Sequence, residues 1–158
     1  MKKILLAILT ASIGATVHAK TPPPLRTIFL CTTTNGKQLS VYRQGKDYIY
    51  SFGRKGQKPE LTFRNSRKDV IKESVTSKEA VATGRNEGAL WRETNMIHKG
   101  YEYTVFWRSP LEGPDEEGVE VYKLKKNRKY GFYEYHHVAT INCDKRYPFI
   151  QHAEWHVF

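Results

Sequence analysis

The sequence predicts a mainly β fold, in which an antiparallel meander forms a small barrel or a strongly curved sheet. Short runs of alternating apolar and polar residues recur along the chain, and turn residues such as Gly, Asn and Pro separate them. These runs are rich in β-branched and aromatic residues, which favour strands. Two cysteines lie near the two ends of this region.

The clearest strand pattern lies in residues 28–53, where Asn35-Gly36 separates two alternating runs. Asn-Gly is the strongest short hairpin signal, because a two-residue type I′ turn needs positive φ at both central positions. A turn centred on this pair predicts the register of the two strands. In that register one face of the hairpin collects Leu30, Thr32, Leu39 and Val41.

The first 19 residues are typical of a secretory signal peptide. Lys2 and Lys3 precede a mostly apolar run, and Val17-His18-Ala19 offers a cleavage site before Lys20. The apolar run is too short to span a bilayer comfortably, so we expect a cleaved, periplasmic protein that is not transmembrane.

The remaining chain is predicted to form one domain with flanking segments. Residues 20–27 contain three consecutive prolines and are expected to be an extended lead-in. We predict the β domain at residues 28–146 and a C-terminal tail at residues 147–158. Within the domain, residues 65–88 are polar and predict a long connection that can hold one short helix, because a structureless loop of this length is unusual. Further strands are expected within 48–52, 60–63, 89–93, 100–107, 119–124 and 130–143.

Cys31 and Cys143 are the only cysteines of a chain predicted to be exported. In an oxidising compartment such a pair most often forms a disulfide, whereas a metal site needs more ligands at defined spacing. We therefore predict a Cys31–Cys143 bridge that ties the first strand to the last. Two free thiols are the alternative.

The chain carries 26 Lys and Arg against 16 Asp and Glu, a net charge of +10. This charge favours anionic partners, such as a glycan, a lipid headgroup or an acidic protein surface, although it can also serve solubility alone. Because the chain has an export signal and no nucleic-acid-binding motif, we do not expect nucleic acid to be a partner.

The sequence contains none of the common catalytic motifs, such as Gly-x-Ser-x-Gly, His-Glu-x-x-His or a phosphate-binding loop. We predict no enzyme, no catalytic residue and no cofactor. The most metal-like segment is His152-Ala153-Glu154-Trp155-His156, whose alternate residues would share a face of a strand. No further ligand accompanies it, so no metal site is predicted.

Ten Tyr, seven Phe and three Trp are many for a small domain. Most are expected in the core, but Tyr and Trp also suit binding surfaces, because they offer large rigid contact area with a polar tip. Four tyrosines on strands flanked by Lys and Arg are the predicted lining of a concave binding face: Tyr48, Tyr50, Tyr101 and Tyr103.

Three segments resemble the small periplasmic β-barrel lysozyme inhibitors, a group that includes the C-type lysozyme inhibitors and the adhesin complex protein. These segments are Phe29-Leu30-Cys31, Gly36-Lys37 and Ile141-Asn142-Cys143. The family's inhibitory Ser-Gly element followed by Tyr is not matched, and Lys99-Gly100-Tyr101 is the nearest equivalent.

The resemblance implies a non-enzymatic binder with a protein partner, either a cell-wall-degrading hydrolase or a delivered toxin against which it gives immunity. A second hypothesis is a binding module for an anionic envelope ligand, such as lipopolysaccharide or an acidic glycan. A third is an enzyme or metal carrier that uses the C-terminal histidines.

Overall fold

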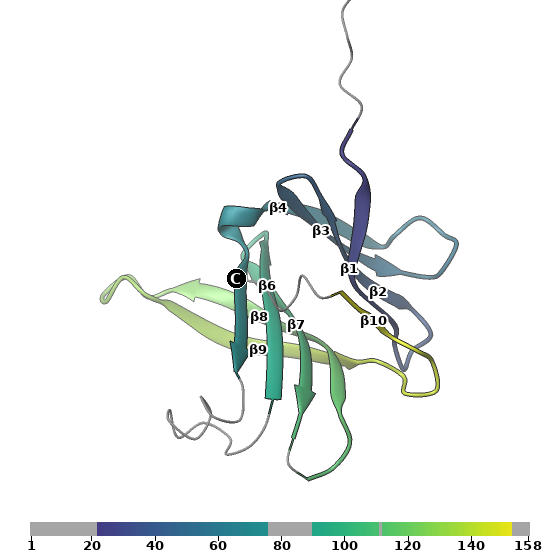
Figure 1. The fold of residues 1–158 in the computed structure, drawn as a ribbon. Helices are drawn as coiled ribbons and strands as arrows, with labels where there is room; N and C mark the ends of the chain where they lie inside the picture. The colour runs from purple at the N-terminus through teal and green to yellow at the C-terminus, as the bar shows by residue number, and fades with distance from the viewer. Residues whose placement is uncertain (1–21, 76–89, 111, 153–158) are drawn as a thin grey trace, which may run out of the picture.

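The computed structural model describes residues 22–75, 90–110 and 112–152 of the 158-residue chain. Within these ranges, two five-stranded antiparallel sheets pack against each other (Figure 1). Sheet 1 has the order β10-β1-β2-β3-β4, with β10 at Ile150–Gln151, β1 at Leu25–Thr32, β2 at Gln38–Gln44, β3 at Asp47–Gly53 and β4 at Leu61–Ser66. Sheet 2 follows chain order, with β5 at Ile71–Val75, β6 at Leu90–His98, β7 at Tyr101–Ser109, β8 at Glu116–Lys126 and β9 at Tyr133–Asn142.

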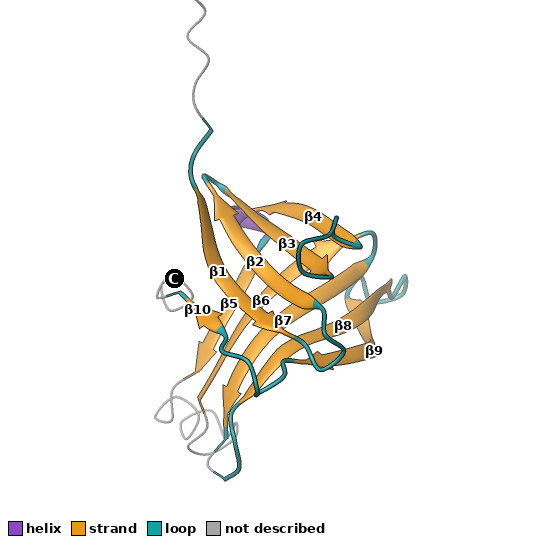
Figure 2. Ribbon diagram, turned by 90° about the vertical axis from the view of Figure 1, so that its right-hand side faces the viewer, coloured by secondary structure: helices purple, strands orange, loops and turns teal. Residues whose placement is uncertain are grey.

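The antiparallel, mainly β prediction is confirmed, but the predicted barrel is not found. Among the described strands the two sheets stay separate and neither is strongly curled. Figure 2 shows the strands of sheet 1 crossing over those of sheet 2 at an angle. A closed barrel would require the edge strands of the two sheets to pair with each other. Every observed strand pair lies within one sheet, so each sheet keeps two edge strands.

The turn between β1 and β2 differs from the predicted type I′ turn and shifts the register by one residue. The Gly36 amide donates to the Thr33 carbonyl at 2.8 Å, and Gly36 has φ +75°. Lys99 is the one non-glycine residue in the described ranges with positive φ, so Asn35 does not adopt the type I′ conformation. This three-residue loop with glycine in the left-handed region is the next commonest hairpin.

The register shift changes which side chains share a face. Cys31 pairs with Leu39, and Phe29 pairs with Val41, and all four are buried. The predicted face of Leu30, Thr32, Leu39 and Val41 is therefore wrong. A one-residue slip exchanges the two faces of a strand, because side chains alternate with a period of two.

Several element boundaries also differ from the predicted ones. β1 begins at Leu25, inside the segment expected to be a lead-in, and β10 lies in the expected C-terminal tail. The first two residues of the polar stretch 65–88 end β4, and a single 3-10 turn, Arg67–Asp69, and β5 follow. Residues 76–88 of the stretch expected to hold one short helix lie outside the described residues, as does the predicted signal peptide.

The core lies between the sheets and is rich in aromatic rings. Tyr50 stacks on Phe63 with ring centroids 4.9 Å apart, and Tyr103 of sheet 2 meets Tyr50 at 5.1 Å. Met96, Val105 and other apolar side chains complete the cluster. Such ring pairs contribute beyond the area they bury, so this contact holds the two sheets face to face.

The predicted Cys31–Cys143 disulfide is present. Cys31 lies on β1 of sheet 1, whereas Cys143 follows β9 of sheet 2, so the bridge joins the two sheets. Backbone hydrogen bonds flank it, because the Asp144 amide donates to the Thr32 carbonyl at 2.7 Å and the Thr34 amide donates to the Asn142 carbonyl at 3.0 Å.

Candidate functional site

Two of the four tyrosines predicted to bind a partner lie in the core. Tyr48 and Tyr50 are 0% and 1% exposed. Burial is the main cause that raises the pKa of Tyr50, and the neighbouring Tyr103 adds to it. Alternate positions of β3 face sheet 2, so these rings pack inside rather than line an open face. The binding role of Tyr101 and Tyr103, which are partly buried, stays a prediction.

The exposed aromatic surface lies elsewhere, on the hairpin formed by β8 and β9. β7 pairs with β8 only as far as Lys123, so residues 125–135 extend beyond the rest of sheet 2. We call these residues the arm; Figure 1 shows it as the green hairpin projecting to the left. Four aromatic side chains of the arm are 52–63% exposed: Tyr130, Phe132, Tyr133 and Tyr135.

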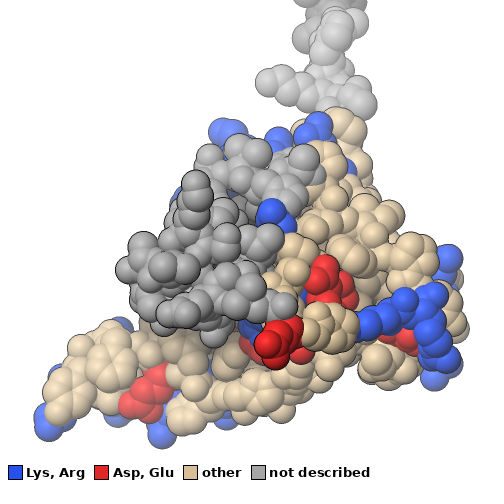
Figure 3. Space-filling model, turned by 60° about the horizontal axis from the view of Figure 1, so that its bottom comes forward, with Lys and Arg blue, Asp and Glu red and all other residues tan. Residues whose placement is uncertain are grey.

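The arm also carries a cluster of exposed cations, Lys125, Lys126, Arg128 and Lys129. In Figure 3 the arm projects at the lower left, with Lys and Arg side chains beside uncharged surface. The sequence marks both parts, since a basic turn precedes alternating tyrosines, but the sequence prediction had placed the binding tyrosines on other strands.

Local contacts give the tip of the arm a defined shape. Asn127 organises it, because its side-chain amide donates to Glu134 at 2.6 Å and its side-chain oxygen accepts from the amide of Lys129 at 3.0 Å. The Gly131 amide donates to the Asn127 carbonyl at 2.9 Å, with Gly131 at φ +76°. The rings of Tyr130 and Phe132 stack with centroids 5.9 Å apart. A preorganised tip loses little conformational entropy when it binds.

A charged network lies on the outer face of sheet 2, on strands β6 to β8. Arg108 donates to Glu93 at 2.8 Å and to both oxygens of Glu120 at 2.9 and 3.0 Å, and the Tyr122 hydroxyl donates to Glu120 at 2.7 Å. The hydrogen bond from Arg108 lowers the pKa of Glu120, while burial and then the bond to Glu120 raise the pKa of Tyr122 to about 12. Each charged group of this network has a partner, so the network fixes side chains rather than leaving an acid or base free to react.

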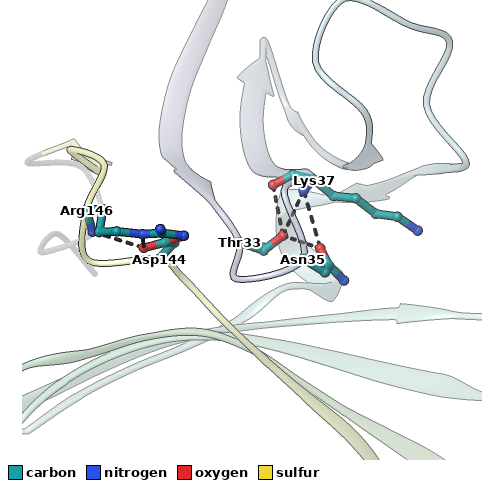
Figure 4. A network of polar contacts seen from close by, with 5 residues as sticks. All are labelled: Thr33, Asn35, Lys37, Asp144 and Arg146. Carbon is teal, nitrogen blue, oxygen red and sulfur yellow. Dashed lines mark hydrogen bonds and ion pairs between the residues drawn. The ribbon is translucent and has the colours of Figure 1, made fainter.

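The network forms part of the wall of a hollow of about 460 Å³ beside the disulfide. A second hollow of about 220 Å³ adjoins it and shares Glu117, Cys143, Asp144 and Lys145 with it. Near their shared wall, Arg146 clamps Asp144 with a closest distance of 2.6 Å, and this contact lowers the pKa of Asp144 (Figure 4).

The β1–β2 turn lies across from this clamp in Figure 4. The Thr33 hydroxyl bridges Asn35 Oδ1 at 2.6 Å and the Lys37 carbonyl at 2.8 Å, which closes the turn. Thr34 of this turn and Asp144 both line the larger hollow, so local polar contacts hold these two parts of its wall.

The predicted metal-like segment reaches the described part of the chain only at His152. Glu154 and His156 lie outside it, and the described residues contain no group of three His, Cys, Asp or Glu side chains arranged for a metal ion. None of the described helical segments has the length and hydrophobicity that crossing a membrane requires.

Comparison with known proteins finds no matching family model, no matching curated protein and no matching solved structure. The resemblance to the periplasmic lysozyme inhibitors stays a prediction.

Proposed function

We propose that this chain is an exported, non-enzymatic binding protein that blocks a protein partner, a cell-wall-degrading hydrolase or a delivered toxin, through its arm. The exposure of Tyr130, Phe132, Tyr133 and Tyr135 carries this proposal. A water-exposed cluster of large aromatic side chains on a projecting hairpin is unfavourable for an isolated domain and favourable for a docking surface.

The composition of the arm supports a protein partner. Tyr and Arg are enriched among the few residues that supply most of the binding energy at protein interfaces, and each such residue contributes about 2 kcal/mol or more. The hairpin shape suits insertion into a concave surface such as the cleft of a hydrolase. The surrounding cations would speed association with a partner that is acidic around its cleft.

The alternative partner is an anionic envelope ligand, lipopolysaccharide or an acidic glycan. The four cations at the tip of the arm favour it, since closely spaced Lys and Arg attract polyanions. Affinity that depends on exposed charges falls steeply with salt, whereas affinity from buried aromatic anchors changes little.

Two matched variants separate these possibilities. The aromatic variant carries Tyr133→Ala and Tyr135→Ala, and the charge variant replaces Lys125, Lys126, Arg128 and Lys129 by Gln. Binding and inhibition are measured against C-type lysozyme and a panel of purified peptidoglycan hydrolases and toxins, at low and high salt. We expect the aromatic variant to weaken inhibition at least about thirtyfold, and the charge variant to weaken it less and mainly through the association rate.

The opposite pattern would overturn the proposal. If no hydrolase or toxin is inhibited, while lipopolysaccharide binds in a salt-sensitive way that only the charge variant abolishes, the partner is the anionic ligand. Thermal unfolding of both variants at the wild-type temperature is the control for folding.

A further inference from the structure

Glu117 is a buried carboxylate to which the described residues offer no partner. It lies near the start of β8 and is 7% exposed, yet no hydrogen bond or ion pair joins it to any described side chain. Burial raises its pKa; nearby Lys145 opposes this effect, while Asp115 and Glu116 add to it. Lys145 is not within ion-pair distance of it in the structure.

The contrast with Glu120 on the same strand is informative. Glu120 accepts three hydrogen bonds from Arg108 and Tyr122, so its charge is compensated inside the protein. Asp144, which lines the same hollow, is clamped by Arg146. The Glu117 carboxylate has no such partner among the described side chains, and its oxygens are not among the sealed, unpaired polar atoms of the described residues, so a cation that enters the hollow can reach it.

The smaller hollow beside Glu117 has the lining that an organic cation needs. It measures about 220 Å³, and its walls include Pro114, Tyr147 and Phe149 together with Asp115 and Glu117. Tyr147 and Phe149 are 52% and 37% exposed, so their rings are accessible. Aromatic faces attract cations through the ring quadrupole, and a carboxylate next to them supplies the charge-assisted hydrogen bond.

We propose that this hollow, with Glu117 in its wall, binds the guanidinium or ammonium end of an Arg or Lys side chain presented by a protein partner. This inference rests on the proposed function for the identity of the partner, and it adds a second contact at the opposite end of β8 from the arm. The hollow is a local acidic site on a chain with a net charge of +10. A cationic side chain of the partner can therefore bind there although the chain as a whole repels positive charge.

The test uses Nα-acetyl-L-arginine methylamide as the probe and Nα-acetyl-L-norleucine methylamide as its uncharged control. Titrating each into ¹⁵N-labelled mature protein and following amide resonances measures the affinity directly. We expect saturable shifts at Glu117, Tyr147 and Phe149 with the arginine probe and none with the norleucine probe.

Two variants should change the affinity in opposite directions. Glu117→Gln should weaken the arginine probe about tenfold, the loss expected for one charge-assisted hydrogen bond. Lys145→Ala, at an exposed position, should tighten it, because the competing ammonium is removed. Equal shifts with both probes, or an unchanged affinity in both variants, would overturn the proposal.

The pH dependence gives an independent readout. Burial raises the pKa of Glu117, Lys145 opposes this effect, and Asp115 and Glu116 add to it, while Asp144 also lines the hollow. Probe affinity should therefore rise with pH as Glu117 loses its proton, and this rise should be absent in Glu117→Gln. The aromatic variant of the arm should still bind the arginine probe. If it binds the probe but no longer inhibits the hydrolase, the arm is the partner's main contact. If the wild type inhibits the hydrolase but does not bind the probe, only the inference about the hollow is refuted.

Discussion

Removing the Cys31–Cys143 bridge tests how the two sheets are held together. We consider the double variant Cys31→Ala with Cys143→Ala, since both positions are nearly buried and Ala adds no polar group. The bridge spans 112 residues, and the chain-entropy relation assigns to a loop of this size about 5 kcal/mol at 25 °C. Stability is lost because the unfolded chain gains conformational entropy when the cross-link is removed.

The folded state keeps part of the connection when the bridge is gone. The backbone hydrogen bonds from Thr34 to Asn142 and from Asp144 to Thr32 still join the β1–β2 turn to the end of β9. We therefore expect the double variant to fold and to lose about 2–5 kcal/mol of unfolding free energy, the range seen for native disulfides in small secreted domains.

Urea denaturation of the oxidised wild type and the double variant at one pH measures this loss. The slope of free energy against urea should also increase, because the unfolded chain without a cross-link exposes more surface. Wild-type protein with both thiols reduced is the control, and it separates the cross-link from the removal of the sulfur atoms. A loss below about 1 kcal/mol with an unchanged slope would refute the reasoning.

Two further predictions concern β8. Gly118→Ala should lower stability by about 1–3 kcal/mol or prevent folding, because the new methyl group would lie 2.3 Å from the Ile141 carbonyl oxygen. Lys123→Ala, at an exposed position of the same strand, is the control, and equal losses in thermal unfolding would contradict this account. Glu117→Gln should be more stable than the wild type at neutral pH. Burial raises the pKa of Glu117 in the folded state above the ordinary Glu value of about 4.3. The folded wild type therefore holds this proton more tightly than the unfolded chain, and its stability falls as pH rises above that value. The difference in Tm between the two proteins should grow over that pH range and vanish at lower pH. A difference independent of pH would refute it.

Local patterns in the sequence determined much of the fold. The alternating runs located the hairpin strands and the strands at 100–107 and 119–124, because a half-buried strand needs that alternation. The pairing of Cys31 with Cys143 follows from there being two cysteines in a chain predicted to be exported. The basic turn before Tyr130 was also visible as a local run of charge.

Long-range packing decided the rest. Asn35-Gly36 is compatible with more than one turn, and the register that buries Phe29, Leu39 and Val41 against sheet 2 selects the three-residue loop. The same packing places Tyr48 and Tyr50 inside and leaves the tyrosines of the arm outside, although both sets alternate in the same way along a strand. A single sequence shows that alternation but not which face meets the second sheet. It also cannot show that Glu120 pairs with Arg108 while no described side chain pairs with the Glu117 carboxylate, because such contacts depend on strand register and packing.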